Sequence, residues 1–312
     1  MTFIVPTPTD LMQISRVADW LELVALVADD GSASASDFEQ ILRREGTFDS
    51  AGYDIAAKIE AHVITVFAEL ESRCRDDKGY YPFKVAGRLL SRAQVRDAKL
   101  LPYLFCLCMS YFDHGKNAKA NGIDPRLLFE HVACLALEGY SGGSAKVFGT
   151  GRIKGVNSFK QAVKEICDFT GEGRGCRQQN TLNKKDDHVD LVAVKHFHDK
   201  KVGKIIFFGQ CATGNDWESK LSELQPIAFW SQWIEPNKVS DILRSFFVPH
   251  EIPADRWDYC AQYGGVLFDR RRLSHWATPT LAHAKLLERV EVWIDGCLRQ
   301  HLVSTTDAVV VT

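Results

Sequence analysis

The chain has 312 residues, of which 46% are hydrophobic and 25% charged, and its formal net charge is −2. This composition is typical of a globular protein with room for two domains, and it excludes nucleic-acid binding through overall positive charge. No apolar run approaches the roughly 18 residues that span a bilayer, the first residues lack a signal-peptide pattern, and the nine cysteines show no CxxC spacing. We therefore expect a cytoplasmic protein with reduced thiols and no membrane association.

The first 140 residues are dominated by helical patterns. In the segment 55–75, apolar side chains recur every three or four positions and so share one side of a helix. Similar patterns predict further helices at 19–28, 36–44, 100–112 and 125–140. We expect an all-α N-terminal domain over residues 1–145, with a role in recognition or partner binding.

A glycine-rich stretch follows this region. Residues 141–157 contain five glycines and are the best candidate for a domain boundary. A phosphate-binding loop is the alternative for this stretch, but that motif needs a preceding strand and a Gly-Lys-Ser/Thr sequence, and the sequence predicts neither here. The stretch is interpreted as a connector that leads into a second domain over residues 152–312.

Helical and strand patterns alternate after the boundary. Helices are predicted at 158–169, 216–224, 254–263 and 281–301, and strands at 176–181, 190–194, 203–214, 242–250 and 265–269. Strands with helices between the later members predict an α/β fold, a mixed sheet with helices on both faces.

The two central strands form a predicted hairpin. In an antiparallel pair centred near Lys200, opposed residues have numbers that sum to about 400, and Asp190 and Gln210 satisfy that sum. Directly opposed residues share a face, with Cβ atoms about 5 Å apart. A carboxylate and an amide oxygen at one end of an apolar hairpin are suitable ligands for Mg²⁺ or Mn²⁺.

These residues resemble a known family. A helix, a strand, a strand that opens with Asp and a strand that closes on Glu/Gln-x-Lys describe the PD-(D/E)XK nucleases, which have the restriction-endonuclease-like fold, and Gln210 resembles the Mrr-like branch of phage-defence enzymes. The resemblance covers residues 155–275. It implies that Asp190 and Gln210 are catalytic and bind the metal, and that Glu165 on the preceding helix is a further metal ligand.

The family's lysine is missing from its usual place. It belongs two residues after Gln210, where this chain has Ala212. Lys220, on the predicted helix that starts just after the strand, is the predicted catalytic substitute. The absence of any catalytic lysine, or the use of another such as Lys195, stays open.

A local excess of positive charge surrounds the predicted site in the sequence. Residues 173–204 contain eight Lys or Arg and four Asp. Such a field suits phosphate binding. The predicted nucleic-acid contacts are Arg174, Arg177, Lys184, Lys185 and Lys204. The alternative is that these are ordinary solvated loops, that Asp190 caps its strand and that Gln210 is a core amide.

The resemblance implies a function. We expect a metal-dependent endonuclease that cleaves nucleic acid, DNA in preference to RNA, in bacterial anti-phage defence. One alternative is a catalytically inactive nuclease-fold subunit that binds nucleic acid or a partner defence protein. Another is an interaction protein that works through its helical half. Homo-oligomerisation is left open.

Overall fold

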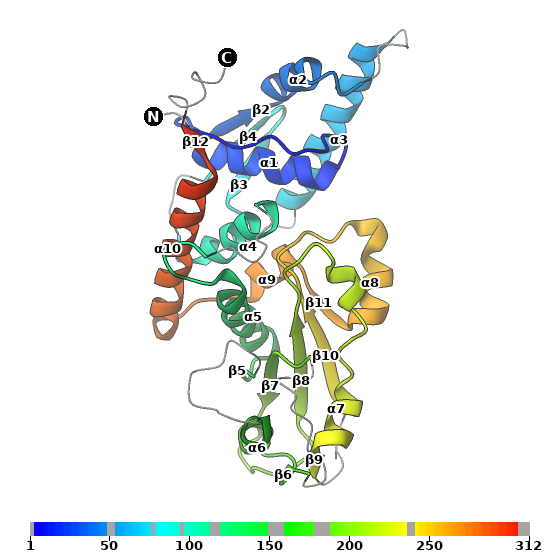
Figure 1. The fold of residues 1–312 in the computed structure, drawn as a ribbon, viewed down its shortest axis with the longest axis vertical. Helices are drawn as coiled ribbons and strands as arrows, with labels where there is room; N and C mark the ends of the chain where they lie inside the picture. The colour runs from blue at the N-terminus through cyan, green and yellow to red at the C-terminus, as the bar shows by residue number, and fades with distance from the viewer. Residues whose placement is uncertain are drawn as a thin grey trace.

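The computed structural model describes residues 3–48, 54–75, 79–93, 97–112, 119–148, 159–177, 188–235 and 241–304 (Figure 1). The α-helices are α1 (Ile14–Val27), α2 (Ala35–Arg44), α3 (Ile55–Arg75), α4 (Leu101–Tyr111), α5 (Pro125–Ser141), α6 (Phe159–Thr170), α7 (Pro226–Trp233), α8 (Trp257–Gly264), α9 (Arg270–Trp276) and α10 (Ala284–His301). The strands are β1 (Phe3–Ile4), β2 (Ser32–Ser34), β3 (Phe83–Ala86), β4 (Leu89–Arg92), β5 (Ser144–Val147), β6 (Gly175–Cys176), β7 (Leu191–Lys195), β8 (Ile205–Cys211), β9 (Ile234–Glu235), β10 (Ile242–Phe247), β11 (Val266–Phe268) and β12 (Val303–Ser304).

The largest sheet has five strands in the order β11-β10-β8-β7-β5. β7 is antiparallel to β8 and β5, whereas β10 and β11 run parallel to β8. The predicted hairpin register is confirmed, because Leu191 pairs with Gly209 and Lys195 with Ile205, and both pairs of numbers sum to 400. The expected mixed sheet is therefore present.

Helices cover both faces of this sheet, as predicted for an α/β domain. On one face, Leu191, Ala193 and Phe207 pack in a core shared with α5. On the other face, Val192 and Phe208 pack in a second core with α6 and α7. Side chains alternate between the faces because a strand has a period of two. Both faces are apolar, which explains why β7 and β8 read as nearly continuous hydrophobic runs.

The N-terminal region is not all-α, which corrects the sequence prediction. β2, β4 and β3 form an antiparallel three-stranded sheet, in that order, beside α1, α2 and α3. Its strands have three or four residues each, and few of their side chains are buried. Strands this short are below the length at which alternation can be recognised in a sequence.

The expected boundary between residues 145 and 152 does not separate two self-contained units. β5 lies within the predicted connector, yet it is the edge strand of the large sheet, and α5 packs on that sheet. In the other direction, α10 returns to pack against α4, and β12 pairs with β1 (Figure 1). Within the described residues, no helix is long and apolar enough to cross a membrane.

A buried cluster of charges joins α1, α3 and α9. Asp19 accepts two hydrogen bonds of 2.8 Å from the Arg270 guanidinium and one of 2.7 Å from Arg73. Arg73 also lies 2.9 Å from Glu22, whose carboxylate accepts a hydrogen bond from the Tyr103 hydroxyl. Burial opposes ionisation of Asp19, but the two guanidinium groups outweigh it and hold its pKa well below the usual value. The cluster ties the N-terminal helices to the large sheet.

The Asp19→Asn substitution is expected to lower the free energy of unfolding by roughly 3–5 kcal/mol, because it leaves two buried guanidinium groups short of negative charge. Urea denaturation measures the change. Asp168→Asn is the matched control, since Asp168 pairs with Lys164 on the surface and its side chain is 63% exposed; there we expect a loss of about 1 kcal/mol or less. Equal losses in the two variants would contradict the structural role of the cluster.

Candidate functional site

Several polar and acidic residues lie at one edge of the large sheet. β8, β10 and β11 are parallel, so their carboxyl ends share an edge, and the antiparallel β7 begins at the same edge. Asp190 precedes β7, Gln210 lies near the end of β8, and Glu251 and Asp269 follow β10 and β11. In open α/β sheets, ligands bind beyond the carboxyl ends of the strands. This edge is therefore the candidate ligand-binding region of the sheet.

Asp190 and Gln210 lie opposite each other in the observed register, because their neighbours Leu191 and Gly209 are paired. The backbone N–H of Asp190 donates to the Gly209 carbonyl at 2.8 Å, and its carboxylate accepts from the N–H of Cys211 at 2.7 Å. Gln210 is only 4% exposed. Its Nε2 donates to Glu223 at 2.8 Å, whereas its Oε1 is buried and receives no hydrogen bond from the protein. Gln210 therefore has an unused acceptor oxygen, on a residue that lies opposite Asp190 in the strand register.

Two residues that the sequence reasoning missed belong to this group. Glu223 lies in the turn between the 3-10 helix Trp217–Lys220 and α7, and it orients the Gln210 amide. His188 lies with its Nδ1 3.4 Å from the Glu223 carboxylate, and its backbone φ is +67°. A non-glycine residue with positive φ is strained, and such strain concentrates at functional sites. Neither residue carries a motif, since Glu223 is 13 positions away from Gln210 and reaches it only through a turn.

Glu165 does not join the predicted metal ligands. It lies on α6 and forms a 3.1 Å ion pair with Lys146 of β5. In the sheet register, Lys146 lies beside Val192 and not beside Asp190. Burial first, and then the carboxylates of Asp190 and of Glu130 on α5, raise the pKa of the Cys211 thiol well above its usual value.

The predicted lysine position is occupied by the uncharged Ala212, two residues after Gln210. Ala212 is 2% exposed and packs in an apolar cluster with Trp217 and Phe246, at the position where the predicted motif would have a lysine. Lys220 forms a 3.1 Å ion pair with Asp216, four residues earlier. Within the described parts of the chain, Lys220 makes no hydrogen bond or ion pair with Asp190 or Gln210.

The predicted nucleic-acid contacts do not surround this site. Lys204 is 2% exposed and pairs with Glu172 at 3.6 Å, so it is a structural residue, and the six positions that separate it from Gln210 span about 20 Å of strand. Arg174 and Arg177 bind backbone carbonyls of the β9 segment, which lies at the opposite end of the sheet (Figure 1). Lys184 and Lys185 lie outside the described residues. Closeness in the sequence did not predict closeness to the site, because the two ends of an extended strand lie far apart.

The metal-binding capacity of the edge is limited. Among the described residues, no group of three or more His, Cys, Asp or Glu side chains is arranged to hold a metal ion. A cation beside Asp190 would therefore depend on the Gln210 amide oxygen and on solvent for further ligands. Carboxylate and amide oxygens are ligand types that Mg²⁺ and Mn²⁺ accept, and both of these are present in Asp190 and in the unused Oε1 of Gln210.

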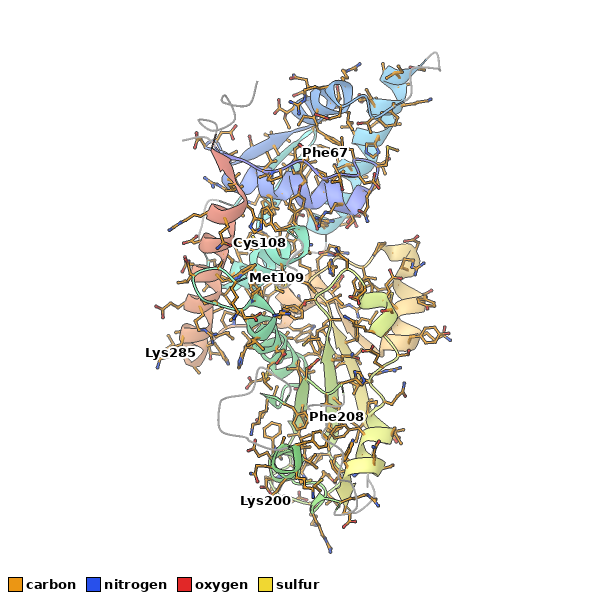
Figure 2. The ribbon with its side chains drawn as sticks, in the orientation of Figure 1. Phe67, Cys108, Met109, Lys200, Phe208 and Lys285 are labelled. Carbon is orange, nitrogen blue, oxygen red and sulfur yellow. The ribbon has the colours of Figure 1, made fainter. Side chains whose placement is uncertain are left out.

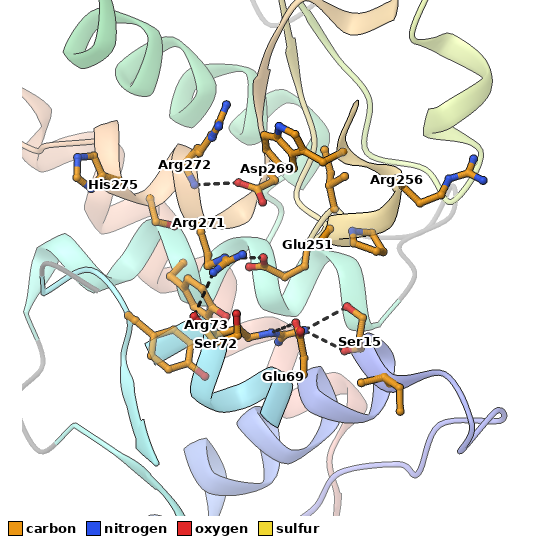
Figure 3. A pocket seen from close by; sticks show the side chains of 18 of the residues that line it. Ser15, Glu69, Ser72, Arg73, Glu251, Arg256, Asp269, Arg271, Arg272 and His275 are labelled. Atoms are coloured by element: carbon orange, nitrogen blue, oxygen red, sulfur yellow. Dashed lines mark hydrogen bonds and ion pairs between the residues drawn. The ribbon is translucent and has the colours of Figure 1, made fainter. Parts of the chain in front are cut away.

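A cavity of about 1190 Å³ opens at the same edge, between the N-terminal helices and the ends of β10 and β11 (Figure 3). Glu251 lies on its floor, 8% exposed, with Oε2 3.0 Å from Arg271 and with Oε1 buried and without a hydrogen bond from the protein. Burial, and then the Asp269 carboxylate, raise the pKa of Glu251 to about 7 against the attraction of Arg73, Arg270 and Arg271. The pKa of Asp269 is raised as well, chiefly by burial.

Comparisons with known proteins add little to this geometry. No family model matches the chain, and no curated protein matches it. Among solved structures, a chain described as protein VC1899 from Vibrio cholerae is 9% identical with a TM-score of 0.23, and the match covers 93% of this chain and 59% of that chain. The chain thus spans less than two thirds of that protein's length, and a likeness this weak carries no argument.

The Glu251→Gln substitution tests the buried carboxyl. Because the folded-state pKa lies near 7 and the unfolded one near 4.5, the folded protein holds a proton that the unfolded chain releases, so stability from this group is lost as pH rises from about 4.5 to 7. We expect the variant and the parent to unfold at similar free energies at pH 5, and the variant to be more stable by roughly 2–3 kcal/mol at pH 8.

Urea denaturation of both proteins at the two pH values measures this difference. His250, whose pKa burial lowers to about 4, favours folding above pH 6.5 and loses that effect on acidification, but it is common to both proteins and cancels. A stability difference that does not change with pH would show that Glu251 is not the titrating group.

Proposed function

We propose that the protein is a metal-dependent phosphodiesterase that cleaves nucleic acid, DNA in preference to RNA, at the Asp190–Gln210 end of the sheet. The observation that carries the proposal is the pairing of a carboxylate with a buried amide oxygen that the protein leaves without a hydrogen bond. An unmet buried acceptor costs about 1–3 kcal/mol, so its retention beside a carboxylate calls for a ligand that compensates it.

The order of the elements supports the same assignment. α5 precedes β5, β7 opens after Asp190, β8 closes on Gln210, and β10 lies parallel to β8 after α7. This succession resembles the PD-(D/E)XK core, with α5 and not α6 as its first helix. By that resemblance we propose a restriction-endonuclease-like fold and a role in cytoplasmic anti-phage defence.

The chain's own residues would share the work in a defined way. Asp190 and Gln210 would hold Mg²⁺ or Mn²⁺, which neutralises phosphate charge and acidifies water when bound. Glu223 accepts a hydrogen bond from Gln210 Nε2, which orients the amide and leaves Oε1 as the atom that could bind the metal. His188, held against Glu223, is placed to accept a proton near this group. Lys220 could supply positive charge only after its pair with Asp216 opens.

Asp190→Asn is expected to lower Mn²⁺-dependent cleavage of plasmid DNA by roughly 100-fold or more, and to weaken Mn²⁺ binding in calorimetry, because it removes the single charged ligand of the proposed pair. Asp199→Asn is the matched control, since Asp199 lies at the other end of the hairpin and only receives the Lys201 N–H. Undiminished cleavage by Asp190→Asn would end the assignment.

A second candidate is a nuclease-fold subunit that binds nucleic acid or a partner defence protein without cleaving. The apolar burial of Ala212 favours it, since no side chain takes the position of the usual lysine. Under this reading, the parent protein shifts DNA in a gel but cleaves none with either metal.

The Lys220→Ala substitution separates the two candidates further. If Lys220 assists the reaction, its loss is expected to lower the cleavage rate by about tenfold or more while leaving DNA binding nearly unchanged. Lys164→Ala is the control, because Lys164 forms a comparable surface pair with Asp168 on α6. Equal rates in the two variants would remove Lys220 from the mechanism.

A further inference from the structure

The cavity at the carboxyl ends of β10 and β11 is separate from the Asp190–Gln210 group. Phe246, the register partner of Gln210, and Ile252, a residue of the cavity lining, belong to one apolar cluster, and none of the predicted site residues lines the cavity. Its walls come from α1 and α3 on one side and from α8 and α9 on the other (Figure 3). Its volume of about 1190 Å³ is as large as that of known small-molecule sites.

The floor of the cavity offers a hydrogen-bond acceptor that the protein does not use. Glu251 Oε2 is occupied by the Nε of Arg271, which leaves Oε1 as the atom without a donor. Figure 3 shows Glu251 reaching between Asp269 and Glu69, with its carboxylate toward Arg271. A ligand that donates an N–H to Oε1 would remove the cost of this buried, unmet oxygen.

The walls offer flat rings and guanidinium groups. The Arg272 guanidinium stacks over the Trp257 ring at 4.2 Å, and on another wall the rings of Tyr80 and His275 lie 4.9 Å apart. Aromatic and guanidinium planes stack on nucleobases.

Arg256, at the start of α8, lies at the rim, where its guanidinium pairs with Glu218 and lies 5.4 Å from the centre of the Tyr259 ring. A phosphate would share or replace the Glu218 carboxylate there, since guanidinium groups bind phosphate in a planar, bidentate manner.

We propose that this cavity binds a nucleotide, with the base stacked against the Trp257–Arg272 wall, a base N–H donated to Glu251 Oε1, and the phosphate facing Arg256. Two elements of the site contact the base and one contacts the phosphate. The proposal does not depend on cleavage at Asp190, because binding here needs neither a metal nor a reaction.

Isothermal titration calorimetry of the full chain in EDTA at pH 8, where the Glu251 carboxyl is ionised and Oε1 can only accept, tests the proposal. The probes are the four nucleoside 5′-monophosphates, ribose 5-phosphate as the ligand without a base, and a short single-stranded oligonucleotide. We expect at least one nucleotide probe to bind roughly 30-fold or more tightly than ribose 5-phosphate, since stacking and the hydrogen bond both belong to the base. Preference for the monophosphate or for the oligonucleotide tells whether the natural source is a free nucleotide or a strand.

Two variants locate the binding. In Glu251→Gln, the amide oxygen is expected to keep the Arg271 bond, which places Nε2 where Oε1 was and sets a donor against the donor of the base; affinity should fall at least tenfold. Trp257→Ala removes a stacking ring at a partly exposed position and should weaken binding to a similar extent. Glu45→Gln is the control, because Glu45 is an exposed partner of Arg44 outside the cavity.

The proposal is overturned if the folded parent protein binds no nucleotide probe at millimolar concentration. It is equally overturned if a nucleotide binds but neither Glu251→Gln nor Trp257→Ala weakens it. Thermal unfolding of each variant confirms that the compared proteins are folded.

Discussion

The buried contact of Asp19 with Arg270 and Arg73 is the constraint on which the rest of the molecule depends. Charges removed from water are tolerated only when each has a close partner, and breaking such a set costs several kcal/mol. Arg270 follows β11 directly, whereas Asp19 and Arg73 come from α1 and α3. A shift of these helices relative to the sheet would leave a buried charge without its partner. The hydrogen bonds of the cluster therefore hold the helices in position against the sheet. One buried apolar core continues from the N-terminal helices to β7 and β8, and Figure 2 shows the side chains of both halves.

That constraint shapes the functional edge. By holding α1 and α3 over the ends of β10 and β11, the cluster forms one wall of the cavity and keeps Glu251 away from solvent. Gln210 and Glu251, each next to a residue of the same apolar cluster, both retain a buried oxygen without a hydrogen bond from the protein. Natural proteins keep few such atoms, and each one marks a place where stability has been given up. Both proposed ligands, a divalent cation and a nucleotide, are assigned to these two atoms.

Reasoning from sequence succeeded where the determining contacts are local. The hairpin register followed from its centre near Lys200 and from the alternation of the strands, so the opposition of Asp190 and Gln210 could be predicted. The helix from Ile55 to Arg75 had the predicted bounds, because its apolar stripe is long and regular. The three short strands β2, β3 and β4 left no comparable signal and were read as part of an all-α domain.

The sequence by itself therefore determined the central hairpin, the α/β class of the sheet and the opposition of Asp190 and Gln210, since all of these depend on period and on near neighbours. Only the tertiary structure decided that Lys204 is a buried partner of Glu172, that Glu165 turns to Lys146, and that Glu223 and His188 join Gln210. It also decided that the chain's last long helix returns to α4. These outcomes depend on turns and packing between distant segments, where small differences in burial and charge pairing, and not residue type, select the partner.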